Sequence, residues 1–165
     1  MNKNPVAFLS IQEGCDKFCS FCVVPYTRGA EYSRPVQDII VEAKNLIKQG
    51  AKEICLLGQN VNAFHGQYKN RTLTLDELIM EIANLSGIKR IRYMTSHPVD
   101  MTEGLIEAHG KVDILMPYLH LPVQSGDNNV LKSMNRKYTV ESYLNIIEKL
   151  KIVREDMAFS SDFIV

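Results

Sequence analysis

Apolar residues in this chain form short continuous runs that alternate with longer stretches in which apolar positions recur at helical spacing. A short continuous apolar run is typical of a strand that is buried on both faces. Strands that alternate with helical stretches indicate βαβ units and a parallel sheet. The pattern therefore predicts an α/β fold with about five parallel strands. The runs occupy residues 6–11, 53–57, 91–94, 118–123 and 158–165.

The stretches between these runs carry signals for the ends of helices. Pro35 suits a helix start, with Ser33 upstream as a candidate cap, and Gly50 suits the position just after a helix. Thr74 and Glu77 have the spacing of a capping box. These signals and the helical spacing predict the positions of the helices. The helices are expected at about 35–49, 74–85, 102–109, 128–134 and 139–150.

Polar groups follow the predicted strands at their carboxyl ends, at residues 58–60, 95–97 and 124–126, and a loop is expected through 64–66. Right-handed crossovers bring these strand ends to one rim, which is where α/β barrels build their sites. A complete eight-unit barrel takes about 250 residues, and this chain has 165. We therefore expect a partial (β/α) barrel with outer helices, truncated at its carboxyl-terminal end.

Composition and charge limit the classes of protein and partner that fit this chain. It has no net formal charge and is 45% hydrophobic, which suits one domain with a substantial core and gives no general case for nucleic-acid binding. No apolar stretch reaches the roughly 18–20 residues of a membrane span. Residues 1–5 lack the apolar core of a signal peptide. We expect a cytoplasmic protein with reduced thiols and no membrane partner.

Three cysteines with the spacing C-x3-C-x2-C, namely Cys15, Cys19 and Cys22, are the strongest chemical signal. Three thiolates can ligate three irons of a [4Fe–4S] cluster and leave the fourth iron open to another molecule. A structural zinc site usually takes four ligands. The remaining cysteine, Cys55, lies in an apolar run and is typical of a core residue. A zinc module is therefore the weaker alternative.

Phe21, directly before the third cysteine, completes a pattern that resembles the radical S-adenosylmethionine (SAM) superfamily. Further short motifs at the strand ends resemble those of the methylthiotransferases of this superfamily, and most closely those of the enzymes that act on tRNA. The resemblance covers nearly the whole chain. These motifs lie at residues 22–29, 57–62, 95–98, 119–126 and 160–165.

The resemblance implies that Cys15, Cys19 and Cys22 hold a [4Fe–4S] cluster and that SAM binds its open iron. Reductive cleavage of SAM would give a 5′-deoxyadenosyl radical, which abstracts hydrogen from C2 of the target adenine before a methylthio group joins that carbon. The implied substrate is N6-isopentenyladenosine beside the anticodon of tRNA, and the implied reductant is flavodoxin or ferredoxin. The alternatives are an inactive fragment that binds a cluster without turnover, and a methylthiotransferase of a ribosomal protein.

The resemblance also assigns SAM contacts to residues of this sequence. Phe21 and Val23 are expected against the adenine, and Gly58 with Gln59 near the amino group of SAM. His97 is as well explained by a structural role as by a functional one, and so is His120. The other expected contacts are Ser96 in the same pocket, Gln124 and Ser125 with the ribose, Arg136 with the carboxylate, and Asp162 with the ribose or the amino group.

Members of the resembled family carry two further domains, one with an auxiliary cluster at the amino-terminal side and one RNA-binding, TRAM-like barrel at the carboxyl-terminal side. We expect residues 1–165 to be a truncated radical SAM core without either domain. A separately encoded remainder of the enzyme is then a possible partner.

Overall fold

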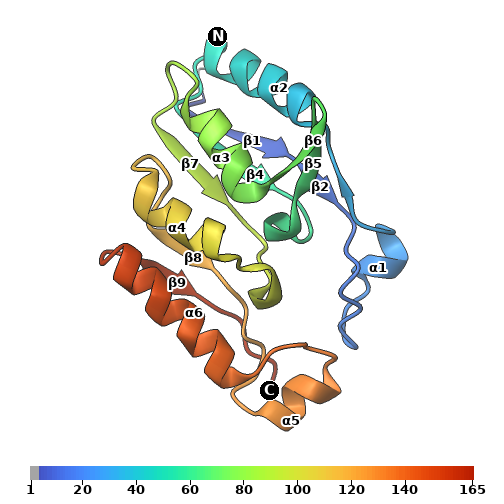
Figure 1. Ribbon diagram of the computed structural model, residues 1–165. Coiled ribbons are helices and arrows are strands. Elements are labelled where there is room, and N and C mark those ends of the chain that lie inside the picture. Colours follow the sequence, from blue (N-terminus) through green and yellow to red (C-terminus); the bar gives the residue numbers. More distant parts are fainter. Residues whose placement is uncertain (1–3) are drawn as a thin grey trace.

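The computed structural model describes residues 4–165, so that residues 1–3, part of the segment that lacks a signal-peptide core, lie outside the described residues. Parallel strands form two groups in the fold (Figure 1). A three-stranded sheet has the order β1–β4–β7, and β8 pairs with β9, parallel in every case. The bounds are β1 Val6–Ser10, β4 Glu53–Leu57, β7 Arg90–Tyr93, β8 Tyr118–His120 and β9 Ala158–Ser160.

A short segment joins the two groups of strands. Ile91 of β7 forms a parallel bridge with Leu115. Its backbone N–H donates to the carbonyl of Ile114 at 2.8 Å, and its carbonyl accepts from the N–H of Met116 at 3.0 Å. The prediction of an α/β fold with parallel strands is thus confirmed, while residues 4–165 form no closed barrel.

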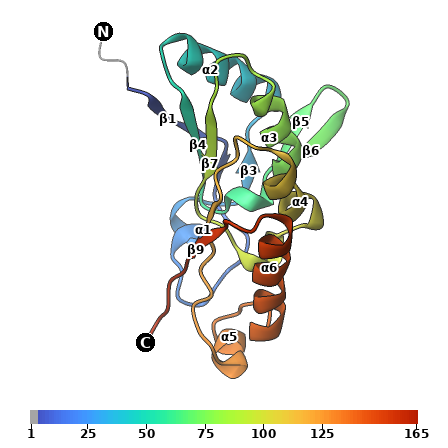
Figure 2. The same cartoon turned by 90° about the vertical axis from the view of Figure 1, so that its left-hand side faces the viewer.

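The helices connect successive strands, and Figure 2 shows α3, α4 and α6 along one side of them. Within the described residues, none of the helices combines the length and the apolar character that crossing a bilayer requires. All five predicted helices are confirmed to within a few residues at their ends. Their bounds are α2 Val36–Lys48, α3 Leu75–Ala83, α4 Glu103–Lys111, α5 Asn128–Ser133 and α6 Val140–Val153.

Local signals account for several of these helix ends. The backbone N–H of Thr74 donates to the Glu77 carboxylate at 3.0 Å, which confirms the capping box of α3. Gly50 has φ of 112°, which confirms its predicted place after α2. The cap predicted for α2 is wrong: Pro35 is the N-cap residue, and the Ser33 hydroxyl instead accepts a hydrogen bond from the N–H of His65 at 3.0 Å.

The loop predicted through residues 64–66 is wrong, because β5 (His65–Tyr68) and β6 (Arg71–Thr74) form an antiparallel hairpin there. Exposed and buried residues alternate along it, and Gly66 fits against the ring of the buried Phe64. The hairpin has no continuous apolar run, so it lacks the signal that marked the other strands. The remaining short elements are β2 Gln12–Glu13, β3 Tyr32–Ser33, α1 Val24–Thr27, η1 Val61–Ala63 and η2 Pro98–Asp100.

The last two predicted strands are shorter than expected. β8 ends at His120 and β9 at Ser160. Their segments nevertheless stay together, because the N–H of Gln124 donates to the carbonyl of Asp162 at 2.9 Å and a parallel bridge joins Gln124 to Phe163. The carboxyl ends of β8 and β9 therefore reach the rim side by side.

The core lies between the three-stranded sheet and its helices. Leu9, Ile54 and Ile91 on the strands are fully buried. Burial of one such side chain contributes on the order of 1.5–3 kcal/mol. Cys55 in β4 is buried too and forms no disulfide, as predicted for a core cysteine. This packing fixes the strand ends on which the polar rim is built.

Candidate functional site

A cavity of about 230 Å³ opens at the carboxyl ends of the strands. It gathers the three clustered cysteines and most of the other predicted site residues into one place. Its lining comprises Cys15, Lys17, Cys19, Phe21, Cys22, Gln59, Asn60, Thr95, Ser96, His97, His120, Pro122, Gln124, Arg136 and Asp162.

The three cysteines of this cavity are free thiols on one loop. Cys19 is buried, whereas Cys15 and Cys22 are partly exposed. The N–H of Cys22 donates to the carbonyl of Cys19 at 2.9 Å, which folds the loop back on itself. Burial raises the pKa of the Cys15 thiol, and the nearby Cys19, Glu31 and Cys22 side chains raise it further. These mutual effects show that the thiols lie near one another, although the described residues contain no group of three His, Cys, Asp or Glu side chains already arranged around a metal position.

Gln12 holds the loop from its amino-terminal side. Its side chain is fully buried, and its Nε2 donates to the carbonyl of Gly14 at 2.7 Å. Its Oε1 accepts from the backbone N–H groups of Gln59 at 2.9 Å and Asn60 at 3.0 Å. Gln12 thereby ties the cysteine loop to the end of β4. No motif in the sequence pointed to this residue, which directly follows the apolar run of residues 6–11.

Gln59 completes the same arrangement from the other side. Its side-chain oxygen, which was expected near the amino group of SAM, accepts from the N–H of Gly14 at 2.8 Å. Gly58 does not line the cavity. A Cβ on Gly58 would lie 2.4 Å from the side-chain oxygen of Gln12, so the glycine makes room for that clamp.

A segment that begins at the end of α5 holds the middle of the cysteine loop. The N–H of Ser20 donates to the carbonyl of Met134 at 3.0 Å, and its hydroxyl donates to the carbonyl of Ser133 at 2.8 Å. Asn135 donates from its side chain to the carbonyl of Phe18 at 2.8 Å. Consecutive residues of one segment thus fix consecutive residues of the loop.

Arg136 comes next in that segment and reaches the cysteines directly. Its Nη1 donates to Sγ of Cys19 at 3.3 Å, its Nη2 to the carbonyl of Pro122 at 3.0 Å, and its Nε to the Tyr138 hydroxyl at 2.9 Å. Only 8% of the residue is exposed. Arg136 was expected to bind the SAM carboxylate, but here its donors are directed to a cysteine and to other groups of the chain.

Three buried polar atoms around the cavity have no hydrogen-bond partner among the described residues: Oδ1 of Asn60, Oγ of Ser96 and Nε2 of His97. Buried polar groups are nearly always paired, so such atoms beside a cavity indicate a bound molecule that completes them. The amide nitrogen of Asn60 is fixed by Asp100 at 2.8 Å. A zwitterionic, hydroxyl-bearing ligand such as SAM fits this set of acceptors and donors. Asn60 was not predicted, although it directly follows Gln59.

His97 is held as a neutral donor. Its Nδ1 accepts from the N–H of Val99 at 3.2 Å, which leaves the proton on Nε2. Burial lowers the pKa of His97 to about 3, and the positive charge of Arg136 lowers it as well. The imidazole therefore offers an N–H, and no charge, at neutral pH.

The comparisons with known proteins agree with this geometry. Residues 9–165 match the family described as the Radical SAM superfamily. The chain belongs to the radical SAM superfamily. A [4Fe–4S] cluster and SAM are the cofactors that this membership implies.

Curated relatives of this radical SAM chain are named tRNA-2-methylthio-N(6)-dimethylallyladenosine synthase. The one from Sphingopyxis alaskensis is 61% identical over 165 residues, which are 99% of this chain and 37% of the relative. The one from Zymomonas mobilis is 63% identical over 160 residues, or 96% and 36%. The chain thus spans little more than a third of the length of these relatives.

Solved structures confirm the fold of the radical SAM chain. The cobalamin-dependent radical enzyme OxsB has a TM-score of 0.71 at 15% identity, over 95% of this chain and 23% of that one. TsrM from Kitasatospora setae, with cobalamin and a [4Fe–4S] cluster bound, has a TM-score of 0.71 at 16% identity, over 96% and 30%.

Besides Gly58, two predicted SAM contacts lie outside the cavity of the cysteines. Val23 is 62% exposed at the start of α1. The Ser125 hydroxyl accepts from the N–H of Asp127 at 3.2 Å and so helps to shape the turn before α5. Asp162 does line the cavity, and its carboxylate lies 3.4 Å from Nε2 of His120.

Besides Asn135 at φ 56°, three residues around the cavity of the cysteines adopt a left-handed backbone although they are not glycine. They are Phe18 at φ 50°, Thr95 at φ 68° and Gln124 at φ 72°. This conformation is strained for side chains with a Cβ, and most strongly for a β-branched one such as threonine. All three lie in segments that approach the cavity, since Thr95 and Gln124 line it and Phe18 precedes Cys19.

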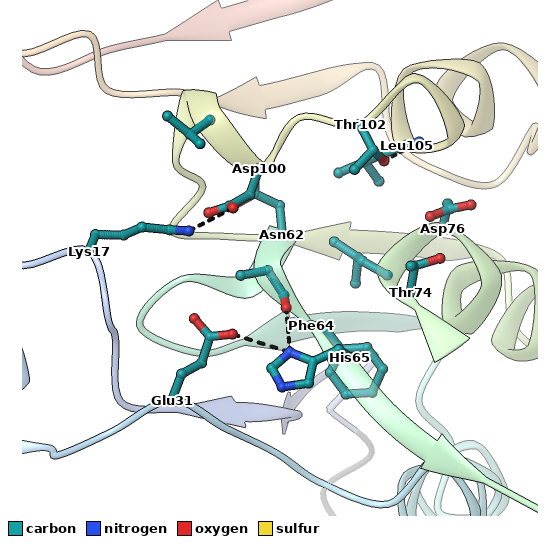
Figure 3. A pocket seen from close by; sticks show the side chains of 13 residues that line it. Lys17, Glu31, Asn62, Phe64, His65, Thr74, Asp76, Asp100, Thr102 and Leu105 are labelled. Carbon is teal, nitrogen blue, oxygen red and sulfur yellow. Dashed lines mark hydrogen bonds and ion pairs between the residues drawn. The ribbon is translucent and has the colours of Figure 1, made fainter. Parts of the chain in front are cut away.

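A second cavity of about 320 Å³ (Figure 3) adjoins the cavity of the cysteines, and Lys17 lines both. The ammonium of Lys17 lies 2.7 Å from the Asp100 carboxylate. On the facing wall, Glu31 lies 3.2 Å from His65. Burial raises the pKa of the Glu31 carboxyl. Because Lys17 lies between Cys15 and Cys19, its ion pair with Asp100 ties the cysteine loop to η2.

Proposed function

We propose that this chain is the cofactor-binding core of a radical SAM methylthiotransferase that modifies tRNA, with Cys15, Cys19 and Cys22 as the ligands of its [4Fe–4S] cluster. One observation carries the proposal: these cysteines share one cavity with unpaired polar groups from the carboxyl ends of two strands, β4 and β7. The identity of about 60% with synthases of tRNA 2-methylthio-N(6)-dimethylallyladenosine supports the same reaction. The target is C2 of N6-isopentenyladenosine beside the anticodon.

When bound, the cluster and SAM supply the 5′-deoxyadenosyl radical that removes hydrogen from the adenine. The residues of the chain bind, orient and exclude water. Gln12 and the segment from Ser133 fix the cysteine loop. Asn60 and His97 would hold SAM: the amide oxygen of Asn60 would accept from its amino group, and His97 would donate to one of its oxygens, because both of these protein atoms are buried without a partner.

The other predicted contacts fit the same arrangement. Phe21, Gln124 and Asp162 line the cavity where the adenine and the ribose of SAM would lie. The two parallel groups of strands form one partial (β/α) barrel in this proposal, continued through the pairing of Ile91 with Leu115. A one-electron donor such as flavodoxin or ferredoxin reduces the cluster in the cytoplasm.

In this function, residues 9–165 bind the cluster and SAM. Because the chain covers 37% of the length of a relative, the auxiliary cluster and RNA binding belong to other segments of the complete enzyme, on the same chain or on a separate one.

Anaerobic reconstitution tests the cluster. The unaltered chain and Cys55→Ala should each take up about four irons and four sulfides, with the broad visible absorption of an iron–sulfur cluster. Cys22→Ala should lose both. Cys55 is the matched control because it is buried in β4, away from the cavity. Tight binding of a single zinc without iron would contradict the proposal.

Mass spectrometry tests the reaction. The reconstituted chain with SAM and dithionite should release 5′-deoxyadenosine. The complete enzyme carrying this core should add a methylthio group to prenylated tRNA and not to unprenylated tRNA. Modification of a ribosomal protein instead would select that alternative, and a loaded chain that never cleaves SAM would be a cluster-binding protein without turnover.

A further inference from the structure

Arg136 is fixed from several sides within the cavity wall. Its backbone N–H donates to the carbonyl of Leu131 at 2.9 Å. Its side chain gives Nε to the Tyr138 hydroxyl at 2.9 Å and Nη2 to the carbonyl of Pro122 at 3.0 Å. The guanidinium also lies 5.0 Å from the centre of the Tyr138 ring. These contacts leave Nη1 directed at Sγ of Cys19, 3.3 Å away.

The other partner of this contact is held just as firmly. Cys19 is buried, with 9% of its surface exposed. Its neighbour Ser20 bonds to the segment before Arg136 through its N–H, at 3.0 Å from the Met134 carbonyl, and through its hydroxyl. On the other side, the Phe18 carbonyl accepts from Asn135 at 2.8 Å. The arginine and the thiol therefore belong to two segments that are docked on each other.

The chemistry of this contact is directional. A guanidinium keeps its charge at every working pH, so it always donates. Hydrogen bonds from charged donors are stronger than those from neutral ones. Hydrogen bonds to cysteine sulfur, burial and nearby charge set the reduction potential of an iron–sulfur cluster. One added electron increases the negative charge on the thiolate ligands, so a cation beside Cys19 stabilises the reduced state more than the oxidised state.

We propose that Arg136 tunes the redox equilibrium of the site: its Nη1 hydrogen bond to Cys19 raises the reduction potential of the cluster that Cys19 ligates. This inference rests on the proposed function, because it requires the cluster on Cys19. Arg136 acts through the cysteine and is a positioning residue. The role differs from the contact with the SAM carboxylate that the sequence predicted for it.

A redox titration monitored by electron paramagnetic resonance, without SAM, measures the effect on the reconstituted chain. Arg136→Gln should lower the equilibrium constant for one-electron reduction about tenfold, which corresponds to a midpoint potential about 59 mV more negative. Arg136→Lys keeps the charge and loses the planar fork, so its potential should lie between the two.

Arg154→Gln is the matched control. Arg154 is also a largely buried arginine that donates to two backbone carbonyls, those of His109 at 3.2 Å and Leu115 at 2.6 Å. It does not line the cavity of the cysteines. The midpoint potential of this variant should equal that of the unaltered chain, even where its stability is reduced.

Each other outcome has a definite meaning. If the Arg136→Gln variant binds a cluster and its midpoint potential is unchanged, the redox inference is wrong while the proposed function stands. If that variant also binds SAM more weakly, Arg136 binds the SAM carboxylate, as the sequence predicted. Loss of iron from both Arg136 variants, while Arg154→Gln loads normally, would assign Arg136 to cluster assembly and also overturn it. Absence of a cluster from the unaltered chain contradicts the proposed function itself.

Discussion

Buried polar residues lie at the amino end of β4 and just beyond the carboxyl ends of β4 and β7, and the two ends of the sheet are completed in different ways. At the amino ends, the Glu53 carboxylate lies 3.0 Å from Nε of Arg92 and 3.2 Å from Nε of Arg90. At the carboxyl ends, Asn60 and Ser96 each keep a buried oxygen without a partner among residues 4–165.

The amino end of this sheet has a structural role, whereas its carboxyl end has groups suited to binding another molecule. A buried carboxylate that finds two arginines in the same chain needs nothing from outside. A buried amide oxygen and a buried hydroxyl beside a cavity cost free energy until another molecule pairs with them. Counting satisfied groups at each strand end therefore locates the binding site independently of the cysteines.

We expect the largest loss of stability when the Gln12 hydrogen bonds at the carboxyl end of β4 are removed. Gln12→Leu leaves the carbonyl of Gly14 and the N–H groups of Gln59 and Asn60 without their partner. We expect a loss of about 3 kcal/mol in the free energy of unfolding, measured with urea, and a large loss of iron on reconstitution. The control is Gln67→Leu, because Gln67 is exposed on the β5–β6 hairpin. Normal iron content in Gln12→Leu would show that the clamp does not position the loop.

A smaller effect is expected at His109, a buried histidine of α4. His109 in α4 lies 2.7 Å from the Tyr93 hydroxyl, and burial lowers its pKa to about 4. Below the ordinary pKa of about 6.5, the unfolded chain binds a proton that the folded chain refuses until about pH 4. The free energy of unfolding should therefore fall between pH 6.5 and pH 4, and His109 should account for about 2 kcal/mol of that fall by pH 5.

The free energy of unfolding is measured with urea across this pH range for the unaltered chain and for His109→Gln. The difference between the two slopes against pH gives the contribution of His109. His65→Gln is the control, since His65 lies exposed on the hairpin. Equal slopes in the unaltered chain and His109→Gln would contradict the prediction.

The smallest effect concerns the amino ends. Glu53→Gln weakens the pairs with Arg90 and Arg92, whose side chains are 55% and 35% exposed. We expect a loss of about 1 kcal/mol in the free energy of unfolding, because partly solvated pairs contribute little. Iron content and midpoint potential should not change. A fall in iron content would mean that the two strand ends are not independent.

Hydrophobic periodicity and the rule for parallel strand ends predicted most of the fold and the position of the cavity. Continuous apolar runs identified the parallel strands, and the capping box at Thr74 identified the start of α3. The rule that parallel strands share one rim predicted that the cysteines would meet Gln59, Ser96 and Gln124. All of these patterns are local, or follow from chain direction alone.

The parts that sequence could not predict depend on contacts between distant residues. Gln59 meets Gly14 across 45 positions, and Arg136 meets Cys19 across 117. The sequence predicted the SAM carboxylate as the partner of Arg136, and the contact with the Cys19 sulfur comes from the docking of the segment after α5 on the cysteine loop. The hairpin was missed because its strands are polar and lie outside the main sheet.

The left-handed backbone at Phe18, Thr95 and Gln124 has a consequence for anyone who alters this protein. Glycine at each position would relieve strain of roughly 1 kcal/mol, so a search for thermostable variants would select these replacements early. The same replacements would loosen the segments that shape the cavity. Selection for heat resistance should therefore favour glycine at these three positions, whereas selection for turnover should favour the residues present there.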